Sequence, residues 1–299
     1  MSGNASENAS APHAVMVGVL ARVQQALAWL PQTRAVILRH YSAAGTAADV
    51  KSDASPVTIA DRACEELLRG LIATAFPGDA VLGEEFGQQQ PAAGAVASGF
   101  RWLVDPIDGT RAYCRGVPLF GTLIGVECQG ACVGGICDCP ALGETVWAWT
   151  GGGCWHQQGQ SPGDVPRPEG AVRARVSVRA GRAGSICGFT AAQGFAERGR
   201  AEVLGGLMQR FEDLRGWSDC YGYVLLATGR LEAMVDPAMK PWDVAALVPI
   251  VREAGGVISA WGGEAESATS AMTDCIAGSE WGYEQAASVV RGDGTQPAT

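Results

Sequence analysis

The chain has 299 residues, 47% of them hydrophobic, so it is long enough to bury a large core as one big domain or two apposed halves. Its formal net charge of −9 argues against a nucleic-acid partner. No segment predicts a transmembrane helix, and residues 1–12 lack the apolar stretch of a secretory leader. We therefore expect no membrane partner and a cytoplasmic location.

Hydrophobic periodicity in the first half predicts two helices followed by antiparallel strands. The helices are expected at residues 15–41, a long amphipathic segment, and at 61–76. A short apolar run at residues 80–82 ends in acids, and strand-like segments begin near Trp102. Three further strands are expected at residues 120–128, 131–139 and 145–155, and a polar, Pro-rich loop is expected at residues 159–170.

The second half alternates strands with helices, a pattern that predicts α and β structure in layers. The expected strands are residues 173–178, 185–188, 231–235 and 256–259. The expected helices are residues 195–210, 219–228 and 244–254. We find no internal repeat, and only the two ends of the chain have the composition of disordered segments.

The most informative stretch is Asp-Pro-Ile-Asp-Gly-Thr at residues 105–110, directly after a strand-like run. Pro106 fixes its own φ and biases Asp105 toward an extended conformation, while Gly109 can adopt angles closed to other residues. Asp105 and Asp108 can thus converge on one point, as in a site for Mg²⁺ and phosphate. The alternative, an Asp-Pro turn followed by an Asp-Gly turn, explains the bend alone.

Three other acids emerge at the ends of predicted elements. Glu84 follows an apolar run, Asp61 lies in the first turn of a helix, and Asp243 follows Pro241 at another helix start. Each has an ordinary explanation, since acids commonly cap helices. Four separate strand or helix ends that each present an acid are harder to dismiss, and they favour one shared site.

The ten cysteines are expected to be reduced core residues. Three of them come closest to a metal pattern, but a second Cys-x-x-Cys pair is lacking: Cys132, Cys137 and Cys139. Others lie in apolar segments, where cysteine behaves as a small hydrophobic residue: Cys128, Cys187 and Cys220. We therefore do not predict a zinc site.

Three elements resemble the inositol monophosphatase superfamily of Mg²⁺-dependent phosphatases, in family order over most of the chain. They are Gly-Glu-Glu at 83–85, the motif at 105–110, and Pro-Trp-Asp at 241–243 with Glu-Ala-Gly-Gly at 253–256. The resemblance implies an α+β and α/β fold, the layered αβαβα sandwich of the inositol monophosphatase and fructose-1,6-bisphosphatase type, and a homodimer. We predict a disordered leader (1–13), an α+β half with the metal site (14–183), an α/β half with the substrate pocket (184–290) and a disordered tail (291–299).

The resemblance also implies two to three Mg²⁺ ions per site. One would be held by Glu84, Asp105 and the carbonyl of Ile107. A second would be held by Asp105, Asp108 and Asp243. A weaker third ion would be reached through water by Asp61 and Glu84.

Catalytic roles follow from the same resemblance. Thr110 and Glu84 would orient and deprotonate the attacking water beside Asp105, and the N–H groups of Gly109 and Thr110 would bind phosphate oxygens. Cations suit this reaction because a phosphate monoester is dianionic and repels a nucleophile. Two of the metal ligands would also adjoin the substrate: Asp108 and Asp243.

The segment at residues 214–223 and Asp236 bear on substrate choice. Asp219, Asp236 and Trp217 suit an ammonium or imidazolium group, and the segment resembles the histidinol-phosphate phosphatase branch of the superfamily. Alternatively, Trp217 and Tyr223 are core aromatics and Asp219 caps a helix, which would favour inositol monophosphate. A 3′-phosphoadenosine 5′-phosphate phosphatase and an inactive relative that binds a phosphorylated metabolite are weaker alternatives.

Overall fold

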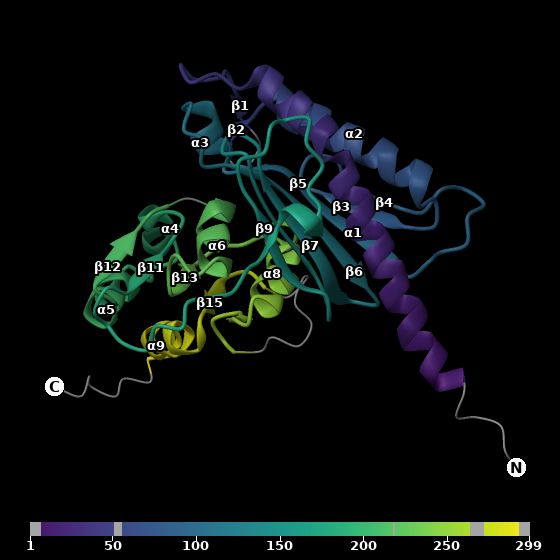
Figure 1. Ribbon diagram of the computed structural model, residues 1–299. Coiled ribbons are helices and arrows are strands. Elements are labelled where there is room, and N and C mark those ends of the chain that lie inside the picture. The colour runs from purple at the N-terminus through teal and green to yellow at the C-terminus, as the bar shows by residue number, and fades with distance from the viewer. Residues whose placement is uncertain (1–6, 51–55, 218, 264–271, 293–299) are drawn as a thin grey trace, which may run out of the picture.

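The computed structural model describes residues 7–50, 56–217, 219–263 and 272–292 (Figure 1). In the first part of the chain the elements are α1 (Glu7–His40), β1 (Asp49–Val50), β2 (Pro56–Val57), α2 (Ile59–Ala75), β3 (Ala80–Gly83), β4 (Gly87–Gln89), β5 (Phe100–Asp108), α3 (Thr110–Cys114), β6 (Gly121–Cys128), β7 (Ala131–Cys139), β8 (Glu144–Trp149), β9 (Gly153–Gln157), a 3₁₀ turn (Pro168–Gly170) and β10 (Val172–Arg173). In the second part they are β11 (Ile186–Gly188), α4 (Ala192–Glu197), α5 (Glu202–Arg210), β12 (Asp213–Arg215), α6 (Asp219–Ala227), β13 (Ala233–Asp236), α7 (Pro241–Ala245), α8 (Leu247–Glu253), β14 (Val257–Ser259), β15 (Cys275–Gly278) and α9 (Glu280–Arg291).

Two large sheets organise the molecule. The first has eight strands in the order β10-β9-β8-β7-β6-β5-β3-β4, antiparallel except for the parallel pair β3 and β5. The second has five strands in the order β12-β11-β13-β15-β14, of which β12, β11 and β13 are parallel. Because β3 and β5 run in the same direction, their carboxyl ends meet at one edge, where the predicted acids lie.

Helices cover both faces of each sheet, and three apolar cores separate the layers (Figure 1). In the first core, α1 and α2 pack on the large sheet through residues such as Leu30 and Leu68. A central core joins both sheets to α6 and α8, with Leu226 and Ile250 among its members. In the third, α5 and α9 pack on the outer face of the small sheet. The predicted αβαβα layering is confirmed.

Most predicted elements are present, but glycines divide two of them. The strand expected at residues 145–155 is a hairpin, β8 and β9, which turns at Gly151 and Gly153 with φ of +74° and +72°. The helix expected at residues 195–210 is two helices, α4 and α5, separated at Gly199 with φ of +66°. A positive φ ends a helix or strand. Residues with a Cβ rarely adopt it, whereas glycine does so readily.

Other differences concern length. Helix α1 begins at Glu7 rather than at residue 15, and the helix expected at residues 244–254 begins at Pro241 and divides into α7 and α8. Of the strand expected at 173–178, only Arg173 belongs to a paired strand, β10 (Val172–Arg173). Strands β12 and β15 and helix α9 were not predicted. The short strands lack a clear alternating pattern, and their pairing with β11 and β13 defines them.

None of the helices in the described part of the chain is both long and apolar enough to cross a membrane. Residues 1–6 of the predicted leader and 293–299 of the predicted tail lie outside the described residues. The two sheets fall on either side of residue 183, since β10 ends at Arg173 and β11 begins at Ile186. The division into halves at residue 183 stays a prediction.

Candidate active site

The end of β5 brings two acids to the edge of the large sheet. Between Asp105 and Asp108 the register with β6 shifts, because three residue steps on β5 oppose two on β6. This bulge changes the direction of the second acid, as an extra residue does in a paired strand. The Asp105 carboxylate accepts a hydrogen bond from the N–H of Ile107 at 3.0 Å, and the Thr122 hydroxyl donates to the Pro106 carbonyl at 2.8 Å. The predicted turn is thus fixed by hydrogen bonds from its backbone to the Asp105 side chain and to Thr122 of the neighbouring strand β6.

The turn continues into the short helix α3 through Gly109. Its φ of +88° is left-handed, and a Cβ there would lie 3.0 Å from the carbonyl oxygen of Leu119 and 3.2 Å from Oδ2 of Asp219. Glycine therefore permits both the conformation and the close approach of α6. The Thr110 hydroxyl donates a hydrogen bond to the Ile107 carbonyl at 2.9 Å, which orients its oxygen at the start of α3.

A third acid approaches from the other part of the chain. Asp243 lies in the first turn of α7, where its carboxylate accepts a hydrogen bond from the N–H of Lys240 at 2.8 Å. Carboxylate oxygens of Asp105, Asp108 and Asp243 all lie within 4.8 Å of one another. Residues separated by more than a hundred positions in the sequence thus meet at one point, as predicted.

Glu84 lies beside these acids because its backbone extends the pairing of β3 with β5. Its N–H donates to the Val104 carbonyl at 3.2 Å. The turn that follows is held by buried Glu65, whose carboxylate accepts hydrogen bonds from the N–H groups of Glu85 and Phe86 at 2.7 and 3.1 Å. A Cβ at Gly83 would lie 2.1 Å from Glu65, so glycine is required there. Sequence reasoning missed Glu65, whose only signal is a charged residue on the apolar face of α2.

A cavity of about 200 Å³ opens over the acids. Predicted site residues make up most of its lining: Glu84, Asp105, Ile107, Asp108, Gly109, Thr110, Asp219 and Asp243. Three other residues complete it, and sequence reasoning gave them no role: Arg111, Lys240 and Trp242. Trp242 carried a signal, because it lies inside the Pro-Trp-Asp motif. The two cations are exposed at the rim, where they attract an anionic ligand.

Burial and mutual repulsion oppose ionisation of the acids. Burial raises the pKa of Asp105 well above its ordinary value, and the charges of Glu84, Asp108 and Asp243 raise it further. The pKa of Asp108 is also raised well above its ordinary value, first by burial. Burial raises the pKa of Asp243 to about 7, although a backbone hydrogen bond from Lys240 opposes the shift. A bound cation would remove this repulsion.

The donor set fits a hard divalent cation. Three carboxylates converge, and Glu84 and the Ile107 residue line the same cavity. Mg²⁺ prefers oxygen ligands and keeps some of its waters, for which the open cavity leaves room. The residues that the cavity brings together are therefore suited to hold Mg²⁺ and the phosphate of a ligand.

Of the three residues expected to set substrate choice, Asp219, Asp236 and Trp217, only Asp219 is among the described residues that line this cavity. It begins α6 and also lines a smaller, adjoining cavity of about 60 Å³ with Asp108, Tyr223 and Asp243. The N–H of the next residue, Cys220, donates a hydrogen bond to the Asp108 carboxylate at 2.5 Å. The start of α6 is thus tied directly to the acidic cluster.

Trp217 and Asp236 lie elsewhere. Neither belongs to the described residues that line the two cavities. Trp217 is half-buried and packs on the central core, whereas buried Asp236 accepts hydrogen bonds from the N–H of Thr190 at 2.8 Å and the hydroxyl of Tyr223 at 2.9 Å. Burial raises the pKa of Asp236 to about 6. The structure therefore places Trp217 against the central core, Tyr223 between that core and the smaller cavity, and Asp236 behind Tyr223.

Asp61 is buried in the first turn of α2, where it forms a capping box with Thr58. Its carboxylate accepts hydrogen bonds from the N–H and the hydroxyl of Thr58 at 2.8 and 2.5 Å. Asp61 is outside the described lining of the main cavity. The capping explanation accounts for these contacts, and its water-mediated role stays a prediction.

Comparisons with known proteins agree with this geometry. The sequence profile of the inositol monophosphatase family matches residues 19–292. The chain is similar to the histidinol-phosphatase of Chlorobaculum parvum, with 41% identity over 206 residues that cover 69% of this chain and 73% of the relative. It is also similar to the histidinol-phosphatase of Mycobacterium tuberculosis, with 37% identity over 217 residues that cover 73% and 78%.

A solved structure shares the fold. Thermotoga maritima IMPase superposes with a TM-score of 0.76 over 91% of this chain and 97% of its own, at 23% sequence identity. The same five layers are therefore compatible with sequences that differ at most positions.

Proposed function

Because the chain belongs to the inositol monophosphatase family, we propose that it is a Mg²⁺-dependent phosphatase whose substrate is histidinol phosphate. Family membership makes it a phosphomonoesterase that acts on a small phosphorylated substrate, and the family is generally metal-dependent. The names of its curated relatives favour histidinol phosphate. The observation in this chain that carries the substrate choice is Asp219, an acid in the lining of the metal-site cavity.

Two to three Mg²⁺ ions are proposed, as the donors permit. Glu84, Asp105 and the Ile107 carbonyl would hold one ion, and Asp105, Asp108 and Asp243 a second. When bound, the ions supply positive charge against a dianionic phosphate and a water of lowered pKa. The third ion, reached by Asp61 and Glu84 through water, is the least supported, because Asp61 caps α2.

The chain's own groups then complete the reaction. Thr110 and Glu84 line the cavity together, and the hydrogen bond from Thr110 to the Ile107 carbonyl orients the hydroxyl. We propose that Thr110 and Glu84 position the attacking water and accept its proton. The N–H groups of Gly109 and Thr110 are proposed to bind phosphate oxygens, and Arg111 at the rim adds positive charge. Hydrolysis is an in-line displacement that needs no side-chain nucleophile.

Asp219 is proposed to bind the cationic end of the substrate. Histidinol phosphate carries an amine and an imidazole, whereas an inositol phosphate carries no cation. A carboxylate beside Asp108 and Asp243 adds to their repulsion and raises the pKa of both, and an approaching cation would relieve this repulsion. Trp242, which lines the same cavity, offers an aromatic surface to such a cation.

The test is phosphate release with Mg²⁺ from L-histidinol phosphate and from myo-inositol 1-phosphate, compared as kcat/KM. We expect a large preference for histidinol phosphate in the natural chain. Asp219→Asn should lower kcat/KM for histidinol phosphate by about 100-fold, the loss of one charge-assisted contact, and for inositol phosphate much less. Equal losses on both substrates would count against the cation pocket.

A matched control separates local from general charge effects. Asp213→Asn removes an exposed carboxylate six residues away, which pairs with Arg215, and should leave both rates unchanged. If the natural chain prefers inositol phosphate, the substrate is inositol monophosphate and Asp219 is only a helix-terminal acid. Activity on neither substrate would contradict the histidinol-phosphatase proposal and turn attention to 3′-phosphoadenosine 5′-phosphate.

We also propose a homodimer in the cytoplasm. The dimer rests on the family resemblance alone, and size-exclusion chromatography with light scattering tests it. The location is supported by the ten cysteines, none of which is in a disulfide, because such thiols persist in a reducing compartment.

A further inference from the structure

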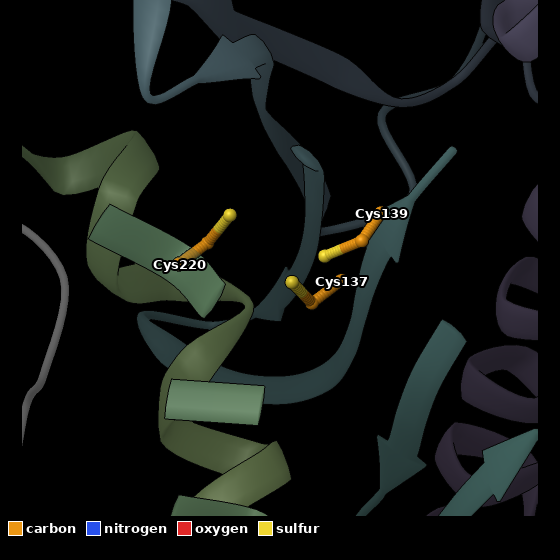
Figure 2. Close-up of side chains that lie close together, drawn as sticks. All are labelled: Cys137, Cys139 and Cys220. Carbon is orange, nitrogen blue, oxygen red and sulfur yellow. The ribbon is translucent and has the colours of Figure 1, made fainter. Parts of the chain in front are cut away.

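Three cysteines meet where α6 packs on the large sheet. Cys137 and Cys139 are two residues apart on β7 and therefore share one face of the strand, while Cys220 lies in the first turn of α6. Figure 2 shows the three side chains pointing toward one another across this junction. Their sulfur atoms all lie within 4.8 Å of one another, and each residue is at most 1% exposed. The cluster is thus a buried group of three sulfur donors.

The local sequence leaves room for these sulfurs. A Cβ at Gly121 of β6 would lie 2.9 Å from Sγ of Cys220 and 3.2 Å from Sγ of Cys139. Asp138, between the two cysteines of β7, belongs to the opposite face and pairs with Arg34 of α1. The alternation of the strand therefore sends the charge to one side and both thiols to the other.

The cluster differs electrostatically from the other buried thiols. Burial raises the pKa of single core cysteines such as Cys64 and Cys187. In the cluster, hydrogen bonds from Cys137 and then Cys220 outweigh burial and lower the pKa of Cys139 to about 6, while hydrogen bonds among the same thiols raise the pKa values of Cys137 and Cys220 well above the ordinary value. Thiolate is the form in which cysteine binds metals, and the pKa directions favour Cys139 as the first thiol of the cluster to lose its proton.

We propose that Cys137, Cys139 and Cys220 bind one soft metal ion, Zn²⁺ or Cu⁺, in a site separate from the carboxylates. A thiolate lies about 2.3 Å from such an ion, so three of them around it are about 4 Å apart, and the observed spacing needs only a small contraction. Sulfur donors select soft ions and reject Mg²⁺. The Asp108 carbonyl lies beside the cluster, 3.9 Å from Sγ of Cys220.

The cluster adjoins the active site, which gives an ion a route to the sulfurs and lets a bound ion affect the activity. Cys220 lines the 60 Å³ cavity together with Asp108, Asp219 and Asp243, three residues that also line the main cavity. The Cys220 N–H also holds the Asp108 carboxylate. Contraction of the sulfurs around an ion would shift the first turn of α6 and with it this hydrogen bond, so we expect a loaded cluster to inhibit phosphate release. The inhibition rests on the proposed phosphatase function, but the metal binding does not.

Binding is tested on the reduced full-length protein with Cd²⁺ as the probe, in excess Mg²⁺ so that the carboxylates are occupied. We expect about one equivalent of Cd²⁺ to produce a thiolate-to-metal charge-transfer band, as a three-sulfur site requires. Cys139→Ser and Cys220→Ser should each lose the band. A band that survives in either variant, or no band in the natural chain, would overturn the proposal.

The control is Cys187→Ser, which replaces another fully buried thiol outside the cluster and should keep the band. Circular dichroism shows whether each variant is folded. Cadmium-113 NMR of the natural chain needs no variant: a chemical shift in the range of sulfur ligands supports the site, and one typical of oxygen ligands contradicts it.

Competition then identifies the ion. Zn²⁺ and Cu⁺ are each added, buffered by a chromophoric chelator, to the Cd²⁺-loaded protein. Displacement by one of them assigns the site, whereas a band that neither ion removes would contradict the proposal.

The coupling to the active site has its own readout. One equivalent of the assigned ion should lower kcat by about tenfold, within the range reported for changes next to metal ligands. Cys139→Ser, which does not touch Asp108, should abolish this inhibition and keep its basal rate. Stoichiometric binding without any change in kcat would refute the coupling and leave the metal site standing. Absence of phosphatase activity in the natural chain would instead count against the proposed function.

Discussion

Two groups of buried or half-buried acids behave in opposite ways. Under α1, Asp79 pairs with Arg22 and Asp138 pairs with Arg34, each at 2.6 Å with side chains at most 9% exposed. At the cavity, three acids converge instead, and none of the ion pairs of the described residues includes them: Asp105, Asp108 and Asp243.

The difference separates acids that are paired within the fold from the acids proposed to bind metal. A buried carboxylate with a guanidinium partner is satisfied within the fold, and removing the partner leaves a costly charge. A carboxylate held against its neighbours resists ionisation, as the raised pKa values of Asp105, Asp108 and Asp243 show. The arrangement of these acids is therefore less stable without a bound cation than with one, and this difference favours metal binding.

The largest effect is expected from Asp105→Asn. This change removes the carboxylate shared by both proposed Mg²⁺ sites, so kcat/KM should fall by about 10³-fold or more. The stability of the fold, by contrast, should stay the same or increase. Since burial raises the pKa of Asp105, its charged form weakens the fold at neutral pH, and the neutral amide should keep or raise the melting temperature in EDTA. Near-natural activity would contradict the mechanism, and a lower melting temperature would contradict the electrostatic account.

Breaking a structural pair should cost about 3 kcal/mol of unfolding free energy, measured by urea denaturation. The change is Arg34→Met, which leaves buried Asp138 without its partner and also removes hydrogen bonds to Thr145 and Gln160. The matched control, Arg62→Met, breaks an exposed pair with Asp49 and should cost at most about 0.5 kcal/mol. Similar losses in both variants would erase the distinction between buried and surface pairs.

Mg²⁺ should stabilise the natural chain through the cavity alone. At about 100 times the dissociation constant, a single bound ion adds about 2.7 kcal/mol to the free energy of unfolding. Calorimetry with Mg²⁺ and with EDTA should show this shift in the natural chain and in Arg34→Met. In Asp105→Asn the shift should largely disappear, and an undiminished shift there would place the ion elsewhere.

A smaller effect is expected from acid titration at Glu144. Burial opposes the ionisation of Glu144, but hydrogen bonds from His156 and Arg230 outweigh this effect and lower the pKa of Glu144 to about 2. Its contribution is present above its unfolded pKa near 4.5 and is lost as the pH falls toward 2. When the pH is lowered, the natural chain loses unfolding free energy. Because Arg230 is partly exposed, Glu144→Gln should reduce this loss by only about 1 kcal/mol. Parallel profiles of unfolding free energy against pH for the natural chain and Glu144→Gln would contradict this assignment.

Sequence patterns predicted that the acids converge, and the part that Asp105, Asp108 and Glu84 contribute is largely local. The turn at residues 105–110 is set by Pro106, Gly109 and hydrogen bonds within it, and Glu84 follows its strand in register. The helices expected from periodicity were found, with glycines dividing what apolar pattern alone had joined. These features depend on neighbours in sequence, so the sequence contains them.

The pocket was harder to predict because its residues are chosen by packing. Asp236 was expected to contact substrate, yet it binds Thr190 and Tyr223. Trp217 packs on the central core, while Trp242 lines the cavity. Which face an aromatic or an acid presents depends on the layers around it, and no local pattern contains that information.

The sequence by itself determined the layered fold class, the converging acids and the family, because periodicity and short motifs act over a few residues. Only the tertiary structure decided that Glu65 fixes the Glu84 turn and that Cys220, more than eighty residues from Cys137 and Cys139, completes a sulfur cluster. Contacts between a helix and a sheet from distant parts of the chain depend on how the layers pack, and packing is a property of the whole fold.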